Sequence, residues 1–95
     1  LLPDVFALHQ NYPNPFNPIT TIRFDIPEES RVSIDIYNVM GQKVSEVVDA
    51  HYQPGFYTVN WAGTNTLGGA LSSGMYFYRI QAKDFTAVKK LLLVK

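Results

Sequence analysis

Hydrophobic and polar side chains alternate along most of this chain, and helical periodicity is hard to find. In residues 20–26 the side chains of Ile22, Phe24 and Ile26 point one way, and residues 31–36 repeat the alternation. This two-residue period is typical of a strand with one face in the core and one face in water. Turn-forming residues Pro27-Glu28-Glu29-Ser30 separate the two runs, so we predict that they form a hairpin.

Four further strands are predicted, over residues 42–49, 56–61, 75–82 and 85–94. A tight connection at Asn38-Val39-Met40-Gly41 leads into the first of them, because Asn and Gly tolerate positive φ. The adjacent pair Val47-Val48 breaks the alternation and indicates a bulge. Gln53-Pro54-Gly55 favours a type II turn. The glycine-rich stretch 63–74 reads as a loop with a short strand around Ala70 and Leu71.

The N-terminal part of the chain has a different pattern. We predict a strand near residues 6–10, followed by a segment with three prolines in the sequence Asn11-Tyr12-Pro13-Asn14-Pro15-Phe16-Asn17-Pro18, here called the proline segment. Each proline fixes its own φ and pushes the preceding residue toward extended geometry, which excludes a helix. Since Tyr12 and Phe16 supply apolar anchors that linkers usually lack, we expect a rigid cover that packs on the sheet.

Together these elements make an all-β chain of about seven antiparallel strands in 95 residues. Turn signals roughly every 8–12 residues are typical of an immunoglobulin-like β-sandwich, which is the predicted fold. An SH3-like or OB barrel is the alternative, although both usually have fewer strands. At this length we expect a single domain spanning residues 1–95.

Charge and composition exclude several classes of protein. The 8 basic and 8 acidic residues balance, whereas nucleic-acid binding and a polybasic membrane anchor both need a basic excess. The longest apolar runs, such as residues 91–94, are far shorter than the roughly 20 residues of a membrane span. The absence of cysteine excludes disulfides and thiol catalysis. Residues 1–4 do not resemble a signal peptide, so the chain reads as a domain cut from a longer parent.

No catalytic, cofactor-binding or metal-ligating residues are predicted. His9 and His51 stand alone in the sequence, and no nucleophile elbow or zinc motif is present. Asp25 and Asp35 fall on the polar faces of the predicted hairpin, where both should be solvated. The glycine-rich loop lacks the Gly-Lys-Ser/Thr of a phosphate site, and too few carboxylates lie in loops for calcium.

Two surface features point to binding. The sequence has more aromatic residues than alternating strands can bury, and some carbohydrate-binding sandwiches use exposed aromatic platforms. The last strand, residues 86–95, is apolar on both faces and carries lysines at Lys89, Lys90 and Lys95. Such a strand is either buried on both faces or offered at an edge to a partner, with lysines that discourage unwanted pairing.

Several motifs together resemble the type A C-terminal sorting domain of the type IX (Por) secretion system, and also the Ig-like domain of the flagellar hook capping protein family. The proline segment is the most specific of them. The others are Ile36-Tyr37-Asn38-Val39-Met40-Gly41-Gln42-Lys43-Val44, Gly55-Phe56-Tyr57 leading to Trp61, Ser73-Gly74-Met75-Tyr76-Phe77-Tyr78-Arg79, and the terminal Lys90-Leu91-Leu92-Leu93-Val94-Lys95. One departure is Ala62, where the family usually has an aspartate that would cap the following turn.

The resemblance implies a non-catalytic sorting signal at the end of a larger exported protein, with a secreted or cell-surface location reached through the periplasm. Its implied partners are an outer-membrane type IX translocon, a sortase-like peptidase and a parent catalytic or adhesive domain. We expect recognition of the folded sandwich and of its terminal β-edge. The residues expected to meet the partner are Lys89, Lys90, Leu91, Leu93 and Lys95. The structural motif residues are Asn11, Pro13, Asn14, Pro15, Phe16, Asn17, Pro18, Gly41, Trp61 and Gly74. The alternative is an accessory Ig-like module of an extracellular enzyme, either glycan-binding or a spacer.

Overall fold

A computed structural model describes residues 1–95 and contains seven β-strands and no helix. The strands are β1 (Ala7–Leu8), β2 (Thr20–Ile26), β3 (Ser30–Tyr37), β4 (Lys43–Tyr52), β5 (Gly55–Trp61), β6 (Gly74–Ala82) and β7 (Phe85–Leu93). The structure therefore contains no helix long and apolar enough to cross a membrane.

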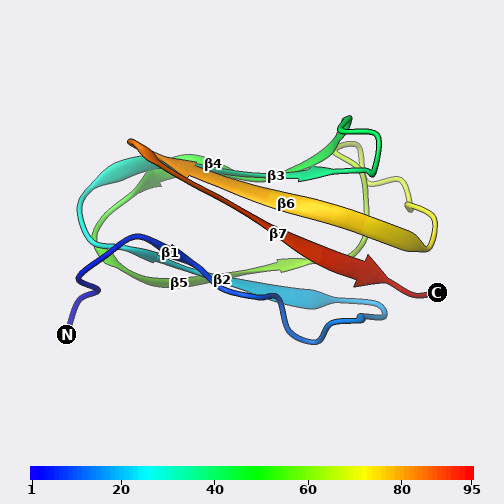
Figure 1. The fold of residues 1–95 in the computed structure, drawn as a ribbon, viewed down its shortest axis with the longest axis horizontal. Helices are drawn as coiled ribbons and strands as arrows, with labels where there is room; N and C mark the ends of the chain where they lie inside the picture. Colours follow the sequence, from blue (N-terminus) through cyan, green and yellow to red (C-terminus); the bar gives the residue numbers. More distant parts are fainter.

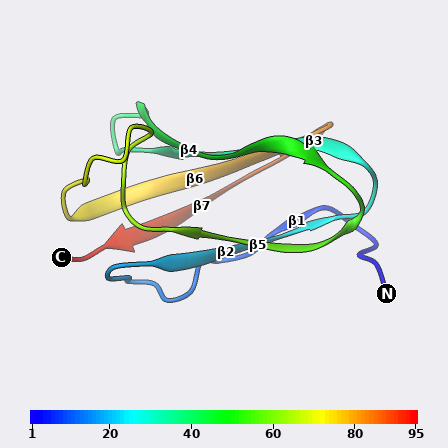
Figure 2. The same cartoon turned by 180° about the vertical axis from the view of Figure 1, so that it is seen from behind.

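The strands form two layers that pack face to face (Figures 1 and 2). One sheet has the order β1-β2-β5 and the other has the order β4-β3-β6-β7, and all paired neighbours are antiparallel. We call them the three-stranded and the four-stranded sheet. This arrangement confirms the predicted immunoglobulin-like sandwich. The chain starts at one end of the long axis and ends at the opposite end (Figure 1).

The alternating residues fill the space between the sheets. Strand β2 contributes Ile22, Phe24 and Ile26, all completely buried, and β3 contributes Val32, Ile34 and Ile36 in the same way. Trp61 is 4% exposed and Tyr78 is fully buried. The predicted inward faces of these strands are confirmed, because one-sided burial imposes the two-residue period.

The predicted hairpin between residues 20–26 and 31–36 is wrong. β2 pairs with β1 and β5, whereas β3 pairs with β4 and β6, so the connection at residues 27–29 crosses from one sheet to the other. Asp25 and Asp35 consequently lie on opposite sheets. Neither is simply solvated: the side chain of Asp25 is 15% exposed and accepts from His9, and Asp35 is buried at 9% exposure.

The connections around β4 match the sequence in part. The register passes from Ile34–Val48 to Asp35–Glu46, which leaves Val47 as the extra residue of the predicted bulge. Gly41 has a φ of +81° in the tight connection from β3. Gly55 does not have the positive φ that a type II turn requires at its third position, so that prediction is wrong. The connection from β4 to β5 instead carries the chain between sheets.

Candidate functional site

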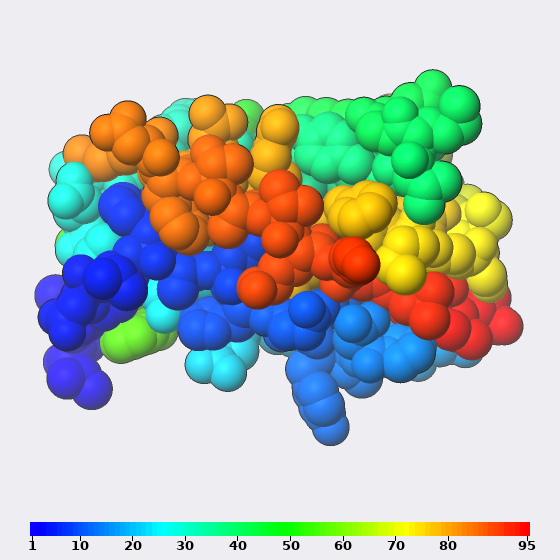
Figure 3. Space-filling model, in the orientation of Figure 1, coloured from blue at the N-terminus to red at the C-terminus, as the bar shows by residue number.

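The proline segment lies along the outer edge of β7, although about eighty residues separate them in sequence (Figures 1 and 3). Phe16 N–H donates to the carbonyl of Leu92 at 3.0 Å, and Val94 N–H donates to the carbonyl of Phe16 at 3.1 Å. The amide oxygen of Asn14 accepts from Leu92 N–H at 2.9 Å. The C-terminal half of this edge is already hydrogen-bonded, so the expected β-edge contact with a partner is not available there in the folded domain.

Phe16 holds the proline segment in the core. It is 1% exposed and its ring lies 5.6 Å from that of Trp61. Tyr12, the second anchor expected from the sequence, is 80% exposed and does not serve as one. Asn11 is buried instead, and its amide donates to Thr20 Oγ1 at 2.9 Å. Pro13, Asn14, Pro15, Asn17 and Pro18 are exposed, and the three prolines follow cis peptide bonds.

Tyr78 ties the two sheets together. From β6 its hydroxyl crosses the core to donate to the carbonyl of His9 at 2.7 Å, and it accepts from Asn11 N–H at 2.8 Å. Burial disfavours the phenolate and raises the pKa of Tyr78 to about 12, while the Asn11 amide opposes this shift. The main chain that leads into the proline segment is therefore fixed from the opposite sheet.

The predicted recognition residues divide between core and surface. Leu91 and Leu93 are 0% and 2% exposed, so the prediction that they meet a partner is corrected: both side chains belong to the core. Lys89 is half-buried, whereas Lys90 and Lys95 are exposed. Because β7 is apolar on both faces, its sequence did not reveal which leucines point inward.

The outward side chains of β6 and β7 form a continuous surface that sequence reasoning missed. The register places Met75 beside Leu92, Phe77 beside Lys90, and Arg79 beside Val88. We call these six residues the recognition face, after the role proposed for them below. Val88 is 56% and Met75 is 39% exposed, and the face carries positive charge from Arg79 and Lys90 without a carboxylate on either strand's outer side. The sequence could have indicated this surface through strand alternation, because its six positions alternate along β6 and β7 with core residues. Those core residues are Tyr76, Tyr78, Leu91 and Leu93.

A hollow of about 360 Å³ opens where the recognition face meets the proline segment. Asn14, Pro15 and Gln10 form one side of it, and Met75, Lys90 and Leu92 form much of the other. Gln10 also donates to the carbonyl of Lys90 at 2.7 Å. The two most distinctive parts of the sequence, the proline segment and the terminal strand, therefore share one concave surface.

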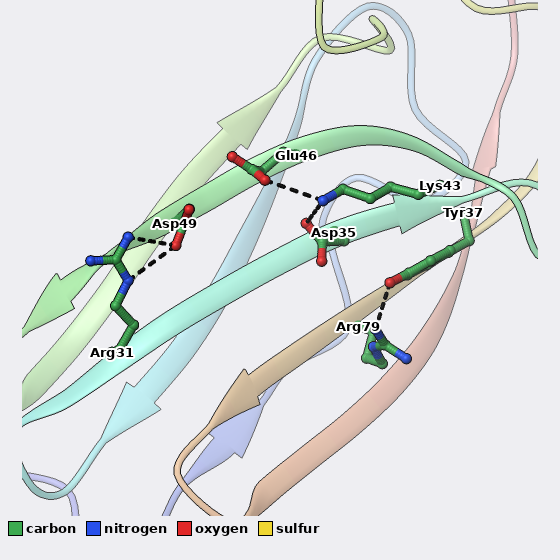
Figure 4. A network of polar contacts seen from close by, with 7 residues as sticks. All are labelled: Arg31, Asp35, Tyr37, Lys43, Glu46, Asp49 and Arg79. Carbon is green, nitrogen blue, oxygen red and sulfur yellow. Dashed lines mark hydrogen bonds and ion pairs between the residues drawn. The ribbon is translucent and has the colours of Figure 1, made fainter.

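Charged and polar side chains of β3, β4 and β6 continue the outer surface of the four-stranded sheet (Figure 4). Arg79 donates to the hydroxyl of Tyr37 at 2.6 Å and lies 5.0 Å from the centre of its ring. The ammonium of Lys43 lies 3.1 Å from Glu46 and 3.3 Å from Oδ1 of the buried Asp35. The Asp35 contact lies outside hydrogen-bond geometry, so this pair is ionic. Glu46 first, and then Asp35, raise the pKa of Lys43.

Each of the two histidines contacts a different carboxylate. His9 contacts Asp25 at 3.0 Å and His51 contacts Glu29 at 3.0 Å, on different sheets. No group of three or more His, Asp or Glu side chains is brought together. Gly74 opens β6, and Gly41 and Trp61 occupy the turn and the core as described.

Comparisons with known proteins agree with the fold. The comparison with curated proteins found no match. The crystal structure of dimeric latent PorU from Porphyromonas gingivalis is similar, with 23% identity and a TM-score of 0.77 over 99% of this chain and 10% of that one. The structure of PorZ, an essential surface component of the type IX secretion system of the same organism, has 16% identity and a TM-score of 0.60 over 97% of this chain and 12% of that one.

This chain thus spans about a tenth of the length of each of those structures, and at such identities the likeness shows the fold alone. The family model for the secretion system C-terminal sorting domain matches residues 10–95. That range begins just before the proline segment and includes all of β7. The chain belongs to the secretion system C-terminal sorting domain family.

Proposed function

We propose that the outer-membrane type IX translocon recognises this domain as a folded unit. The surface that it binds is proposed to be the recognition face with its hollow. Family membership establishes the broader role: the domain is a sorting signal of the type IX secretion system, and it directs a larger protein to the cell surface or the medium. The domain is proposed to be non-catalytic, with any activity residing in a parent catalytic or adhesive domain.

The observation that carries the proposal is the meeting of the proline segment with β7. A single concave surface contains Asn14 and Pro15 from one and Lys90 and Leu92 from the other. Neither segment alone forms this surface, so an unfolded or truncated signal would lack it. Recognition of the fold then also verifies that the chain has folded.

The chemistry of the recognition face indicates the kind of partner that fits it. Apolar contact area comes from Met75, Phe77 and Leu92, and positive charge comes from Arg79 and Lys90. A partner surface with apolar side chains bordered by carboxylates would complement both. A sortase-like peptidase is proposed to act on the exported protein after this recognition.

The test uses export of a reporter. Residues 1–95 are fused behind a signal peptide and a fluorescent protein in a host with type IX export, and surface or medium fluorescence is measured. Lys90→Glu, alone and with Lys95→Glu, should reduce export without changing the melting temperature, since exposed substitutions usually change stability by under about 0.5 kcal/mol. Arg23→Glu is the matched control, because Arg23 is exposed on the three-stranded sheet and has no ion-pair partner.

Deletion of residues 86–95 is a weaker test than these substitutions. It would remove Leu91 and Leu93 from the core, so lost export could reflect lost folding. Unchanged export of the double lysine variant and of a Phe77→Ser variant would contradict the proposed surface. If the intact domain itself gives no export, the accessory-module alternative is favoured.

A further inference from the structure

The four outer strand edges of this sandwich differ in how they are protected. β1 has only two residues, and the C-terminal half of β7 is covered by the proline segment. β4 carries Lys43 and Glu46, contains the bulge at Val47, and accepts a hydrogen bond at Val44 O from Thr66 N–H at 3.3 Å. Short length, cover, charge and bulges are the usual devices that prevent edge-to-edge pairing. The remaining edge, that of β5, has none of them.

β5 runs from Gly55 to Trp61 without a charge, a proline or a bulge. The main-chain N–H and C=O of Thr21 both hydrogen-bond to Tyr12, at 2.9 and 3.0 Å. These two groups of Thr21 therefore point away from β5. By strand alternation, Ile22 and Phe24 of β2 bond to Val59 and Tyr57 of β5. Phe56, Thr58 and Asn60 therefore direct their N–H and C=O groups outward, where nothing in the domain pairs with them.

The core beside this edge is incompletely covered. Val44 and Val47 of β4 and Tyr57 and Val59 of β5 pack against the core but stay partly exposed. At one end of this gap a hollow of about 350 Å³ opens, with Val47, Asn60 and Trp61 among its lining residues. An additional strand beside β5 would place alternate side chains over these apolar groups.

We propose that the occupant is a second copy of this chain, which pairs its own β5 with β5 in an antiparallel, two-fold symmetric arrangement. Among the strands longer than two residues, β5 alone carries no charged residue, so two copies meet without like-charge repulsion. With Thr58 at the symmetry axis, Phe56 of each copy lies opposite Asn60 of the other. Tyr57 and Val59 of the second copy then fall on the core side. This inference goes beyond the sorting role.

The first test places a cysteine at the proposed axis. The chain has no cysteine, so Thr58→Cys introduces a single thiol. Directly opposite residues of an antiparallel pair have Cα atoms about 4.5–5.5 Å apart, which lies within the range of about 4.4–6.8 Å for a disulfide. Under a mild oxidant, Thr58→Cys should form a covalent dimer on non-reducing electrophoresis at concentrations where Thr86→Cys stays monomeric. Thr86 is the matched control because it is an exposed threonine on β7.

The second test measures self-association by analytical ultracentrifugation from micromolar to millimolar protein. Thr58→Lys would oppose two ammonium groups at the axis and should raise the dimer dissociation constant at least about fivefold, whereas Thr86→Lys should not. Both threonines are exposed, so thermal melts should show folded protein in both variants. The proposal is overturned if the wild type stays monomeric while the Thr58→Cys and Thr86→Cys variants cross-link at equal rates. A dimer that is indifferent to Thr58→Lys would also overturn it, because its interface would lie elsewhere.

Discussion

Two irregular segments of this domain are both rich in turn-forming residues but differ in how they are held: the proline segment and residues 62–73, here called the glycine loop. Phe16 of the proline segment is 1% exposed, and main-chain hydrogen bonds tie the segment to β2 and β7. Of the two leucines in the glycine loop, Leu67 at the tip is 95% exposed, whereas Leu71 at the base is half-buried. The Asn65 amide oxygen accepts from Leu67 and Gly69 N–H at 3.0 and 2.8 Å, so much of the loop's bonding is internal.

The difference shows what makes an irregular segment part of a fold. Both segments are rich in turn formers, which fix local geometry but supply little burial. The proline segment adds one large side chain that reaches the core and main-chain groups that complete an exposed edge. The glycine loop is held less fully. Leu71 at its base is half-buried against the core and its N–H donates to the Gly63 carbonyl at 2.9 Å, and Thr66 N–H donates to the Val44 carbonyl of β4 at 3.3 Å. We therefore expect stability to depend on the first segment and to be nearly indifferent to the tip of the second.

Trp61→Ala should have the largest effect, because Trp61 supports both segments. Its ring packs 5.6 Å from Phe16, and its indole N–H donates to the Thr64 carbonyl at 3.0 Å. Truncation of a buried Trp costs about 3–5 kcal/mol, which approaches the whole stability of a small domain. The variant should be largely unfolded at room temperature by circular dichroism. Trp61→Phe, which keeps most of the volume, should stay folded; a cooperative melt of the alanine variant near the wild-type temperature would contradict this.

The sequence revealed the inward faces of β2 and β3, because alternation records burial directly. It did not reveal which strands are neighbours, since β2 and β3 would alternate identically in a hairpin or in two sheets. Within β7 the alternation gave no answer for a different reason. Leu91, Leu92, Leu93 and Val94 are all apolar, so either alternate set could have faced the core. Only the pairing with β6 and the proline segment settles that Leu91 and Leu93 point inward.

Substitutions within the proline segment should distinguish the contributions of Phe16 and Tyr12 to the free energy of unfolding. Phe16→Ala should destabilise the domain by about 3–5 kcal/mol, because it leaves a cavity beside Trp61. Tyr12→Ser should change stability by under about 0.5 kcal/mol, because Tyr12 is 80% exposed. Urea unfolding followed by tryptophan fluorescence measures both. Equal effects from the two changes would mean that the segment is held by its main chain rather than by Phe16.

Tyr78→Phe should have an intermediate effect and test the polar link between the sheets. The change removes the donor to the His9 carbonyl and the acceptor for Asn11 N–H. Buried groups left unsatisfied in this way cost about 1–3 kcal/mol. Chemical denaturation at neutral pH should show that loss, with Tyr37→Phe as a more exposed comparison. Hydrogen exchange of the Asn11 amide should also accelerate in Tyr78→Phe; unchanged protection there would contradict the proposed link.

The same hydroxyl predicts a loss of stability at alkaline pH. The folded pKa of Tyr78 is about 12, above its ordinary value of 10.0. The hydroxyl's contribution is complete below pH 10, where Tyr78 is protonated in both states, and is lost as pH rises through about 10 to 12. Denaturation midpoints measured across this range should fall, and the fall should be shallower in Tyr78→Phe. Parallel curves for the two proteins would mean that other groups cause the alkaline loss.

The sequence could not reveal the concave surface beside β7, because it joins residues from the two ends of the chain. The proline segment was recognisable as a motif, but Asn14 acquires its role only through Leu92 N–H, which lies in the last strand. Likewise, the sequence indicated an exposed charge at Lys90 but not which residues lie beside it. Phe77 and Gln10 become its neighbours through strand register and packing. Chemistry that depends on long-range register is not encoded in any local pattern.

Leu67→Ser should have the smallest effect, and it completes the comparison from the side of the glycine loop. Leu67 is 95% exposed, so its replacement removes almost no burial and should change the free energy of unfolding by under about 0.5 kcal/mol. Gly63→Ala is the contrasting change within the same loop. Gly63 has a φ of +69°, and a Cβ there would lie 3.2 Å from Leu93 side-chain atoms, so it should destabilise the domain. The urea unfolding midpoints of the two variants are compared with that of the wild type. A large loss of stability from Leu67→Ser would show that the loop tip, like Phe16, is packed in solution.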